Sequence, residues 1–137
     1  MLDCMIVGDS IAVGIGMVRK ECVTYAKSGW SSNAWNRDYS EKALQQPAET
    51  VIISLGANDH AGINSELELR KVREKIQSKR VFWISPGMER KPRAQTAIEK
   101  IANEYGDIVL PRPKEHMSSD RVHPTFKGYK ILGEQTK

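Results

Sequence analysis

The sequence has few cysteines and no long apolar run, and each shortage excludes a class of protein. Two cysteines, Cys4 and Cys22, are too few for the disulfide framework of a small secreted domain. We expect both thiols to be free and buried, which suits a reducing compartment. The longest apolar run, 11–18, is far shorter than the roughly 18 residues of a membrane span, so no membrane partner is expected. No basic leader precedes the first strand-like run, which favours a cytoplasmic protein or one released without a classical leader.

Motifs for metal and nucleotide binding are also missing. The three histidines lack the spacing of a helical zinc site, so no metal is expected. The glycines of segment 8–16 fit neither the P-loop nor the dinucleotide-binding pattern. The net charge is only +4, and the basic residues of segment 70–80 alternate with glutamates. This alternation is typical of a solvated helix face, and no nucleic-acid partner is expected. A binding face for an anionic polymer is the alternative.

Short β-rich runs alternate with helical patterns along the whole chain. With 39% hydrophobic and 28% charged residues in 137, the composition predicts one globular domain over residues 1–137. Strands followed by helices indicate a parallel sheet covered on both faces. The expected fold is therefore a flavodoxin-like three-layer α/β/α sandwich whose five-stranded sheet has the order 2-1-3-4-5. The five runs are Cys4–Val7, Cys22–Tyr25, Val51–Leu55, Val81–Ile84 and Ile108–Leu110.

Four helices are expected between and after these runs. Ser65 and Glu68 form the sequence pattern of a capping box at the start of one helix. Pro92 and Gly106 are typical of the first position and the end of another. The remaining two are expected at 32–46 and directly after Pro124.

Glycines and polar residues follow four of the five expected strands. In parallel sheets of this kind, ligands bind beyond the carboxyl ends of the strands. We therefore expect these segments to converge on one site at that edge. The four segments are Gly8–Ser10, Ala26–Trp30, Gly56–His60 and Asp120–Pro124.

Ser10, His123 and Asp120 together carry the pattern of nucleophilic catalysis. A serine hydroxyl is a poor nucleophile until a base takes its proton, and histidine is the natural base near neutral pH. A carboxylate three residues before the histidine can hold its ring in the working tautomer. Taken singly, each has an ordinary explanation, namely a helix N-cap, a loop histidine and an exposed loop charge. Only their combination predicts an active site.

Asn58, Gly29 and Ser10 are the candidates for an oxyanion hole. Acyl transfer develops negative charge on the carbonyl oxygen, and preorganised donors must meet it. The Asn58 amide and the backbone N–H groups of Ser10 and Gly29 are expected to supply three such donors. Trp30 and His60 are tentative substrate-binding residues. The alternative for Trp30 is a partly buried loop anchor.

Together these segments resemble the SGNH, or GDSL-like, hydrolase family. Gly8-Asp9-Ser10 is similar to the nucleophile block, although Ile11 replaces the leucine that often follows it. Gly29 is similar to the second block, Gly56–Asp59 to the third and Asp120–Pro124 to the last. The resemblance implies the flavodoxin-like fold, serine esterase chemistry through an acyl-enzyme, a Ser–His–Asp triad, and neither a metal nor an organic cofactor.

The connections after the strands leave little chain for a hydrophobic lid. This favours a short acyl group, such as acetyl, on a carbohydrate, a polysaccharide or another small alcohol. The alternative is a lysophospholipase-like or thioesterase-like hydrolase of longer acyl chains.

Two non-enzymatic functions are also open. A receiver-like module fits Asp9, Asp59, Ser85 and Lys114 loosely, but it lacks the usual acidic pair and leaves Asp120 and His123 unexplained. A non-catalytic carbohydrate-binding relative is the other alternative. The oligomeric state does not follow from the sequence.

Overall fold

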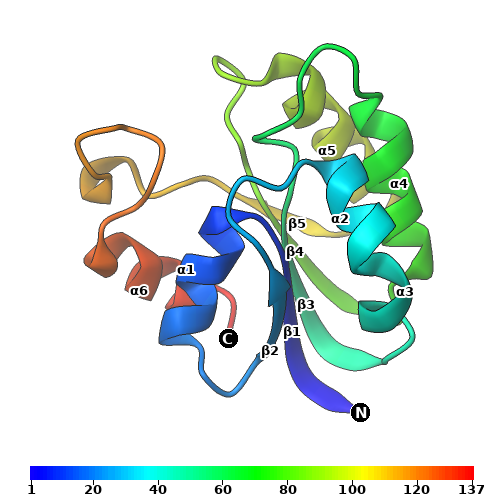
Figure 1. Ribbon diagram of the computed structural model, residues 1–137. Coiled ribbons are helices and arrows are strands. Elements are labelled where there is room, and N and C mark those ends of the chain that lie inside the picture. Colours follow the sequence, from blue (N-terminus) through cyan, green and yellow to red (C-terminus); the bar gives the residue numbers. More distant parts are fainter.

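A computed structural model of the protein describes all 137 residues and contains one parallel sheet. The strand order is β2-β1-β3-β4-β5, which confirms the expected fold class (Figure 1). Most strands start or end one to three residues away from the sequence-based boundaries. The strands are β1 (Leu2–Gly8), β2 (Val23–Ala26), β3 (Ala48–Ser54), β4 (Arg80–Ile84) and β5 (Ile108–Leu110).

Helices cover both faces of the sheet and complete the three layers (Figure 1). One face carries α1 (Ser10–Val18) and α6 (Phe126–Gln135), which pack against each other. The other face carries α2 (Ser32–Asp38), α3 (Ser40–Ala43), α4 (Ser65–Lys75) and α5 (Pro92–Tyr105). A 3-10 turn, η1 (Lys114–His116), lies between β5 and α6. No helix is long and apolar enough to cross a membrane.

Each face of the sheet has its own hydrophobic core. Because successive side chains of a strand point to opposite faces, Met5 and Val7 belong to the larger core and Cys4 and Ile6 to the smaller one. The larger core includes the fully buried Trp35 and Trp83. Their indole N–H groups donate to the Tyr25 carbonyl at 2.8 Å and to Asp107 Oδ2 at 3.0 Å. Both tryptophans are therefore satisfied structural residues.

Two of the helix expectations are wrong in detail. Helix α4 is capped by Asn64, whose side chain accepts from the Leu67 amide at 3.1 Å, and Ser65 is the first helical residue. The Ser65 hydroxyl donates instead to Asp59 Oδ2 at 2.7 Å, so there is no capping box. The stretch 32–46 forms α2 and α3 rather than one helix. They are separated at Tyr39, whose backbone leaves the helical region and whose ring packs edge-on against Trp30.

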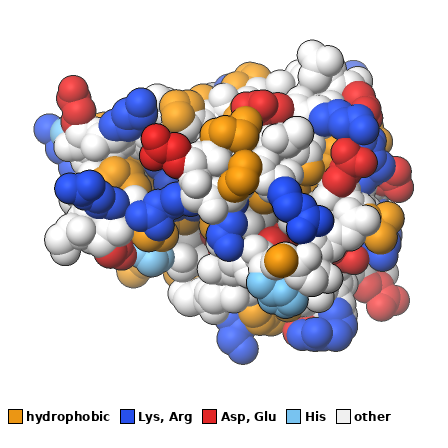
Figure 2. Space-filling model, turned by 90° about the horizontal axis from the view of Figure 1, so that it is seen from above, with side chains coloured by type: hydrophobic (Ala, Val, Ile, Leu, Met, Phe, Trp, Pro, Cys, Tyr) orange, Lys and Arg blue, Asp and Glu red, His pale blue; other side chains and the backbone are white.

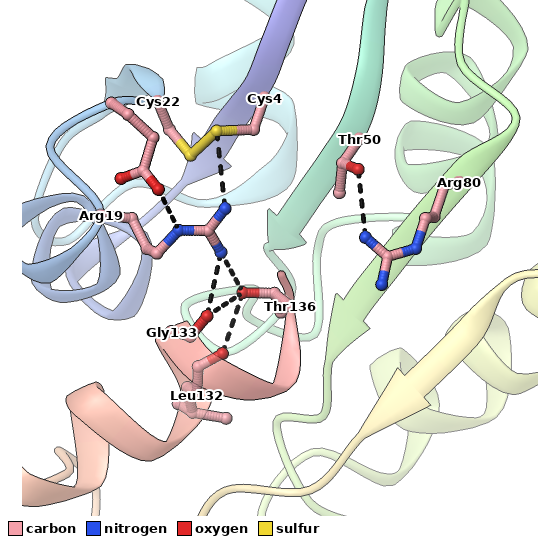
Figure 3. The surroundings of a disulfide bond; sticks show 9 residues. Cys4, Arg19, Cys22, Thr50, Arg80, Leu132, Gly133 and Thr136 are labelled. Carbon is pink, nitrogen blue, oxygen red and sulfur yellow. Dashed lines mark hydrogen bonds and ion pairs between the residues drawn. A yellow bond between two sulfur atoms is a disulfide. The ribbon is translucent and has the colours of Figure 1, made fainter.

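The expectation of two free cysteines is also wrong, because Cys4 and Cys22 form a disulfide (Figure 3). The parallel register of β1 and β2 pairs Met5 with Val23, which places the preceding residue of each strand side by side. Their Cα atoms lie 4.7 Å apart, within the range of a disulfide. Both cysteines are buried as expected. The argument for a reducing compartment loses its basis.

Candidate active site

The junction between β1 and α1 presents Ser10 at the start of a helix. Gly8 has a φ of +142°, and a side chain there would overlap the Ser54 carbonyl oxygen of β3. Only glycine fits this close approach. Asp9, and not Ser10, is the N-cap of α1, and its Oδ1 accepts from the Ile11 amide at 3.1 Å. The Ser10 hydroxyl is therefore free to make other contacts.

Asp9, the residue before Ser10, is almost fully buried. Its Oδ1 also accepts from the Ser54 hydroxyl at 2.9 Å, while Oδ2 has no hydrogen-bond partner. Burial raises the pKa of Asp9 to about 6, against the opposing effects of these hydrogen bonds and of the nearby Arg112 charge. The Asp9 side chain thus caps the helix, although burial of its negative charge is energetically unfavourable.

Ser10, His123 and Asp120 form a continuous hydrogen-bonded chain. Ser10 Oγ lies 2.9 Å from His123 Nε2, although the two residues are 113 positions apart in the sequence. His123 Nδ1 lies 2.8 Å from Asp120 Oδ2. If Nδ1 carries the proton and donates it to Asp120, Nε2 is left as an acceptor for the Ser10 hydroxyl. The structure brings all three predicted catalytic side chains together in the order of a triad.

The turn that carries Asp120 and His123 is ordered by its own hydrogen bonds. Asp120 Oδ1 accepts from the backbone amides of Val122 at 2.8 Å and His123 at 3.0 Å, and Ser118 Oγ lies 2.7 Å away. The hydrogen bonds from His123, Val122 and Ser118 hold the pKa of Asp120 well below its usual range. Asp120 is therefore ionised throughout the neutral range, although its side chain is 50% exposed.

Contacts from outside the turn fix it against the rest of the protein. The Ser118 amide donates to the His123 carbonyl at 2.8 Å, and Arg112 Nη1 donates to the Val122 carbonyl at 2.7 Å. Arg121 has a φ of +59°, the single residue other than glycine in the left-handed region. The His123 side chain is 42% exposed, so the site opens to solvent rather than lying under a lid.

Asn58 and Gly29 lie in the loops after β3 and β2, as expected. Asn58 Nδ2 donates one hydrogen bond to the Trp30 carbonyl at 3.0 Å. An amide nitrogen has two N–H groups, so this bond orients the side chain and leaves the second donor available. Gly29 has a φ of +84°, which favours glycine, and its amide makes no backbone hydrogen bond. The loops after β2 and β3 thus each leave one N–H donor without a protein partner.

Asp59, the residue after Asn58, stabilises the loop and is buried, with an exposed fraction of 6%. Its Oδ1 accepts from the Ser32 amide and its Oδ2 from the Ser32 hydroxyl, both at 2.7 Å. Together with the bond from Ser65, three donors from α2 and α4 hold this carboxylate. Asp59 therefore has the structural role that its place after Asn58 indicates.

The two tentative substrate-binding residues differ in their surroundings. Trp30 is half-buried, its ring centroid lies 4.5 Å from that of Tyr39, and Lys27 Nζ lies 5.5 Å from the indole centroid. These contacts favour the loop-anchor interpretation. His60 is exposed, and its Nδ1 accepts from the Gly62 amide at 3.1 Å. No contact joins either ring to the Ser10–His123–Asp120 chain.

Several residues that support the site were missed by the sequence analysis. Arg112 and Ser118 hold the turn, and Lys91 Nζ donates to the Asp59 carbonyl at 2.9 Å. The only signal in the sequence is the group of basic residues at 90–93, which has no motif of its own. Arg112 and Ser118 have no motif of their own, because their contacts form only when the turn folds.

Comparison by sequence finds no family model and no curated protein that matches the chain. Comparison by structure finds several esterases and acylhydrolases of similar fold. An acetyl xylan esterase from Geobacillus stearothermophilus is 19% identical with a TM-score of 0.68, over 95% of this chain and 90% of that one. A lipase/acylhydrolase from Enterococcus faecalis is 16% identical with a TM-score of 0.71, over 96% and 91%.

A third similar structure is a GDSL-like lipase from Bacteroides thetaiotaomicron. It is 18% identical with a TM-score of 0.67, over 96% of this chain and 83% of that one. At these identities the likeness establishes the fold and leaves the chemistry to be argued from the site. The chain therefore has the three-layer fold shared by acetyl xylan esterases and GDSL-like lipases.

Proposed function

We propose that the protein is a serine esterase of the SGNH type, with residues 1–137 forming one catalytic domain. The observation that carries this proposal is the chain from Ser10 Oγ through His123 to Asp120, with contacts of 2.9 and 2.8 Å. The four sequence blocks that resemble the family and the fold of the similar structures support it. A receiver-like or purely binding module would not need the hydrogen bonds that join Ser10, His123 and Asp120.

In the proposed reaction, His123 Nε2 takes the Ser10 proton as Ser10 Oγ attacks the ester carbonyl carbon. The ionised Asp120 stabilises the imidazolium that forms and holds its ring in place. His123 then returns the proton to the departing alcohol, which leaves an acyl group on Ser10. A water molecule, deprotonated by His123, attacks the acyl carbon, and the bond to Ser10 Oγ breaks as His123 returns the proton to Ser10, which releases the acid. In this proposal the protein's own side chains supply the nucleophile, the base and the orienting carboxylate.

The negative charge on the carbonyl oxygen is met by the oxyanion-hole donors. We assign these to the backbone N–H groups of Ser10 and Gly29 and the free N–H of Asn58. Ser10 is the first residue of α1, where amides lack intrahelical acceptors and the helix dipole favours negative charge. The bond from Asn58 to the Trp30 carbonyl preorganises its donor, so little reorganisation is needed during the reaction.

The proposed substrate is a short acyl ester, such as an acetyl group on a carbohydrate or another small alcohol. Solvent reaches both His123 and Asp120, which suits a shallow cleft that admits one sugar of a polymer. The loops at this edge are short to moderate in length, and the longest, 111–125 after β5, carries the turn with Asp120 and His123, so little chain is left for the walls of a deep acyl tunnel. The similar acetyl xylan esterase fold is consistent with this size of acyl group.

The test is an acyl-length profile on p-nitrophenyl esters from acetyl to dodecanoyl. Acetyl and butyryl esters are expected to have the highest kcat/KM, with a decline from octanoyl onward. A rate that climbs past octanoyl would instead support the longer-chain hydrolase. Purified Ser10→Ala protein serves as the background control. Absence of hydrolysis above that control on every ester would contradict the esterase proposal itself.

A further inference from the structure

The loops after β4 and β5 enclose a basic pocket that adjoins the triad turn. This pocket has a volume of about 410 Å³. Its floor includes Ser85, Pro86 and Met117, and its charged lining consists of Arg90, Arg112, Lys114, Arg121 and a single acidic residue, Glu89. It belongs to the carboxyl edge of the sheet. Figure 2 looks onto this edge from above and shows Lys and Arg side chains distributed across it.

The pocket is physically linked to the catalytic residues on two sides. Arg121 lines the pocket and lies between Asp120 and His123 in the sequence. Arg112 Nη1 donates to the Val122 carbonyl at 2.7 Å, and Arg90 Nη2 lies 3.5 Å from the Asp120 carbonyl oxygen. A group held in the pocket would therefore lie beside the turn that presents the base to Ser10.

The four cations of the pocket have no carboxylate partner. Four arginines elsewhere in the protein form ion pairs with carboxylates, among them Arg73 with Asp107 at 2.7 Å and Arg70 with Glu104. None of the pocket cations forms an ion pair within 4.0 Å, although Asp120 and Glu89 are near. Asp120 is already occupied by His123 and by the amides of its own turn. The pocket lining thus holds four positive charges and one carboxylate, Glu89, with the buried Asp9 near Arg112.

Arg112 has hydrogen-bond donors that the protein leaves unused. Its side chain is partly buried, and a guanidinium offers five N–H donors in a fixed fork, of which only Nη1 has a protein partner. Nη2 is therefore unpaired, and carboxylate and phosphate oxygens match this fork in geometry and charge.

We infer that the basic pocket binds an anionic group of the substrate, a carboxylate or phosphate on the same molecule as the ester that Ser10 cleaves. This inference rests on the proposed esterase function and adds the substrate class, acyl esters of acidic molecules. Anion binding places the scissile ester against Ser10 and so raises kcat/KM for acidic esters over neutral ones of the same shape. The positive potential also steers such substrates toward the site.

The first experiment compares matched acidic and neutral esters. The substrates are acetoxyacetate and the ω-acetoxy derivatives of butyrate, hexanoate and octanoate, each beside its primary amide, with ω-acetoxyalkyl phosphates as a separate arm. Acetate release gives kcat/KM. We expect the best acid to exceed its amide by at least about 10-fold, and the chain length of that acid reports the reach from pocket to Ser10. The excess should shrink as salt screens the charges. The carboxylate and phosphate arms identify which anion is preferred.

The second experiment removes two of the cations. Lys114→Gln/Arg121→Gln is compared with Lys42→Gln/Lys75→Gln, which removes the same charge from exposed positions on α3 and α4. The acid-to-amide ratio is expected to fall at least about 5-fold in the pocket variant and to stay unchanged in the control, since charged hydrogen bonds in partly buried sites contribute on this scale. Equal ratios in wild type and pocket variant, with the amides still hydrolysed, would overturn the anion pocket and leave the esterase proposal intact.

Binding measured without turnover separates the two proposals. Ser10→Ala protein is titrated with the acetoxyhexanoate and with its amide, and NMR shifts report the affinities. Tighter binding of the acid, lost in the background of Lys114→Gln/Arg121→Gln, would support the pocket even if the wild-type protein hydrolysed neither compound. Equal affinity for acid and amide would overturn it.

Discussion

The two ends of helix α1 differ in exposure and in contacts, although Ser10 and Arg19 are only nine positions apart in the sequence. At its start, Ser10 faces an open site in which His123 and Asp120 are 42% and 50% exposed. At its end, Arg19 is buried and donates to the Gly133 carbonyl at 2.9 Å and to Thr136 Oγ1 at 2.8 Å (Figure 3). Its Nη2 lies 3.7 Å from Cys4 Sγ of the disulfide. One end of the helix presents chemistry, and the other anchors the fold.

The difference indicates how the protein orders the exposed side chains of the proposed triad. Asp120 and His123 are ordered by short-range bonds within their own turn, so the site needs no burial to be preorganised. The anchoring end depends on contacts between β1, α1 and the end of α6, which are distant in the sequence. Changes at the first end should therefore alter turnover and spare stability, and changes at the second should do the reverse.

The largest expected effect comes from breaking the His123–Asp120 pair. His123→Ala should lower kcat by about 10³-fold or more, because the base is lost, while the melting temperature stays close to that of the wild type. The double variant with Asp120→Ala should be little worse, since the two residues act as one unit. Steady-state kinetics of both single variants and the double variant measure this coupling. Multiplicative losses would mean that Asp120 acts independently of His123.

Removal of the side-chain donor of the oxyanion hole should have the next largest effect. Asn58→Ala is expected to lower kcat by about 10²- to 10³-fold with a smaller change in KM, since the donor acts mainly when charge develops. The matched control is Asn33→Ala. Asn33 is exposed near the start of α2, and its substitution should leave the wild-type kcat unchanged. If Asn58→Ala raised KM alone, Asn58 would be a ground-state contact or a turn residue.

At the anchoring end, reduction of the disulfide should change stability and spare the chemistry. Cys4 and Cys22 close a loop with a sequence separation of 18, for which chain entropy predicts a stabilisation of about 3 kcal/mol. Urea unfolding with and without reductant measures this difference, and Cys4→Ala/Cys22→Ala controls for side reactions of the thiols. Well below the unfolding transition, kcat on a short ester should be the same in both states. A large loss of kcat in the folded, reduced protein would show that the two ends of α1 are coupled.

The smallest effect concerns Asp9, the buried N-cap at the Ser10 end of α1, where a change in stability rather than in turnover is expected. Its pKa of about 6 exceeds the ordinary value, so its contribution to stability is complete at pH values below the ordinary pKa and is lost as pH rises through 6. Asp9→Asn removes this dependence. The free energy of unfolding of the wild type, relative to the variant, should fall by about 2 kcal/mol between pH 4 and 7. Urea titrations at several pH values test this prediction. A relative stability that rises with pH would contradict the claim that burial raises the pKa of Asp9.

A loss of activity on the acid side is not expected to come from Asp120. Hydrogen bonds hold the pKa of Asp120 far below the neutral range, so this carboxylate stays ionised and keeps orienting His123 at mildly acidic pH.

The fold and the triad could be predicted because their signals are local. Five apolar runs with intervening helical patterns imply the parallel sheet, and Asp120 and His123 are close in the sequence. The disulfide could not be predicted, because it depends on the β1–β2 register that pairs Met5 with Val23. The break at Tyr39 and the redirected hydroxyl of Ser65 depend likewise on tertiary partners, Trp30 and Asp59. The basic pocket could not be predicted, because its cations come together only in the folded protein. Arg90 lies in the loop after β4, whereas Arg112, Lys114 and Arg121 lie in the loop after β5.

The central claim, that Ser10 is the nucleophile, is tested most directly by covalent trapping. A fluorophosphonate ester reacts with an activated serine, and intact-protein and peptide mass spectrometry then locate the adduct. We expect one adduct on Ser10, loss of esterase turnover in proportion to labelling, and no adduct in Ser10→Ala, whose turnover should fall by at least about 10³-fold. An adduct on another residue, or near-wild-type turnover by folded Ser10→Ala protein, would contradict the account.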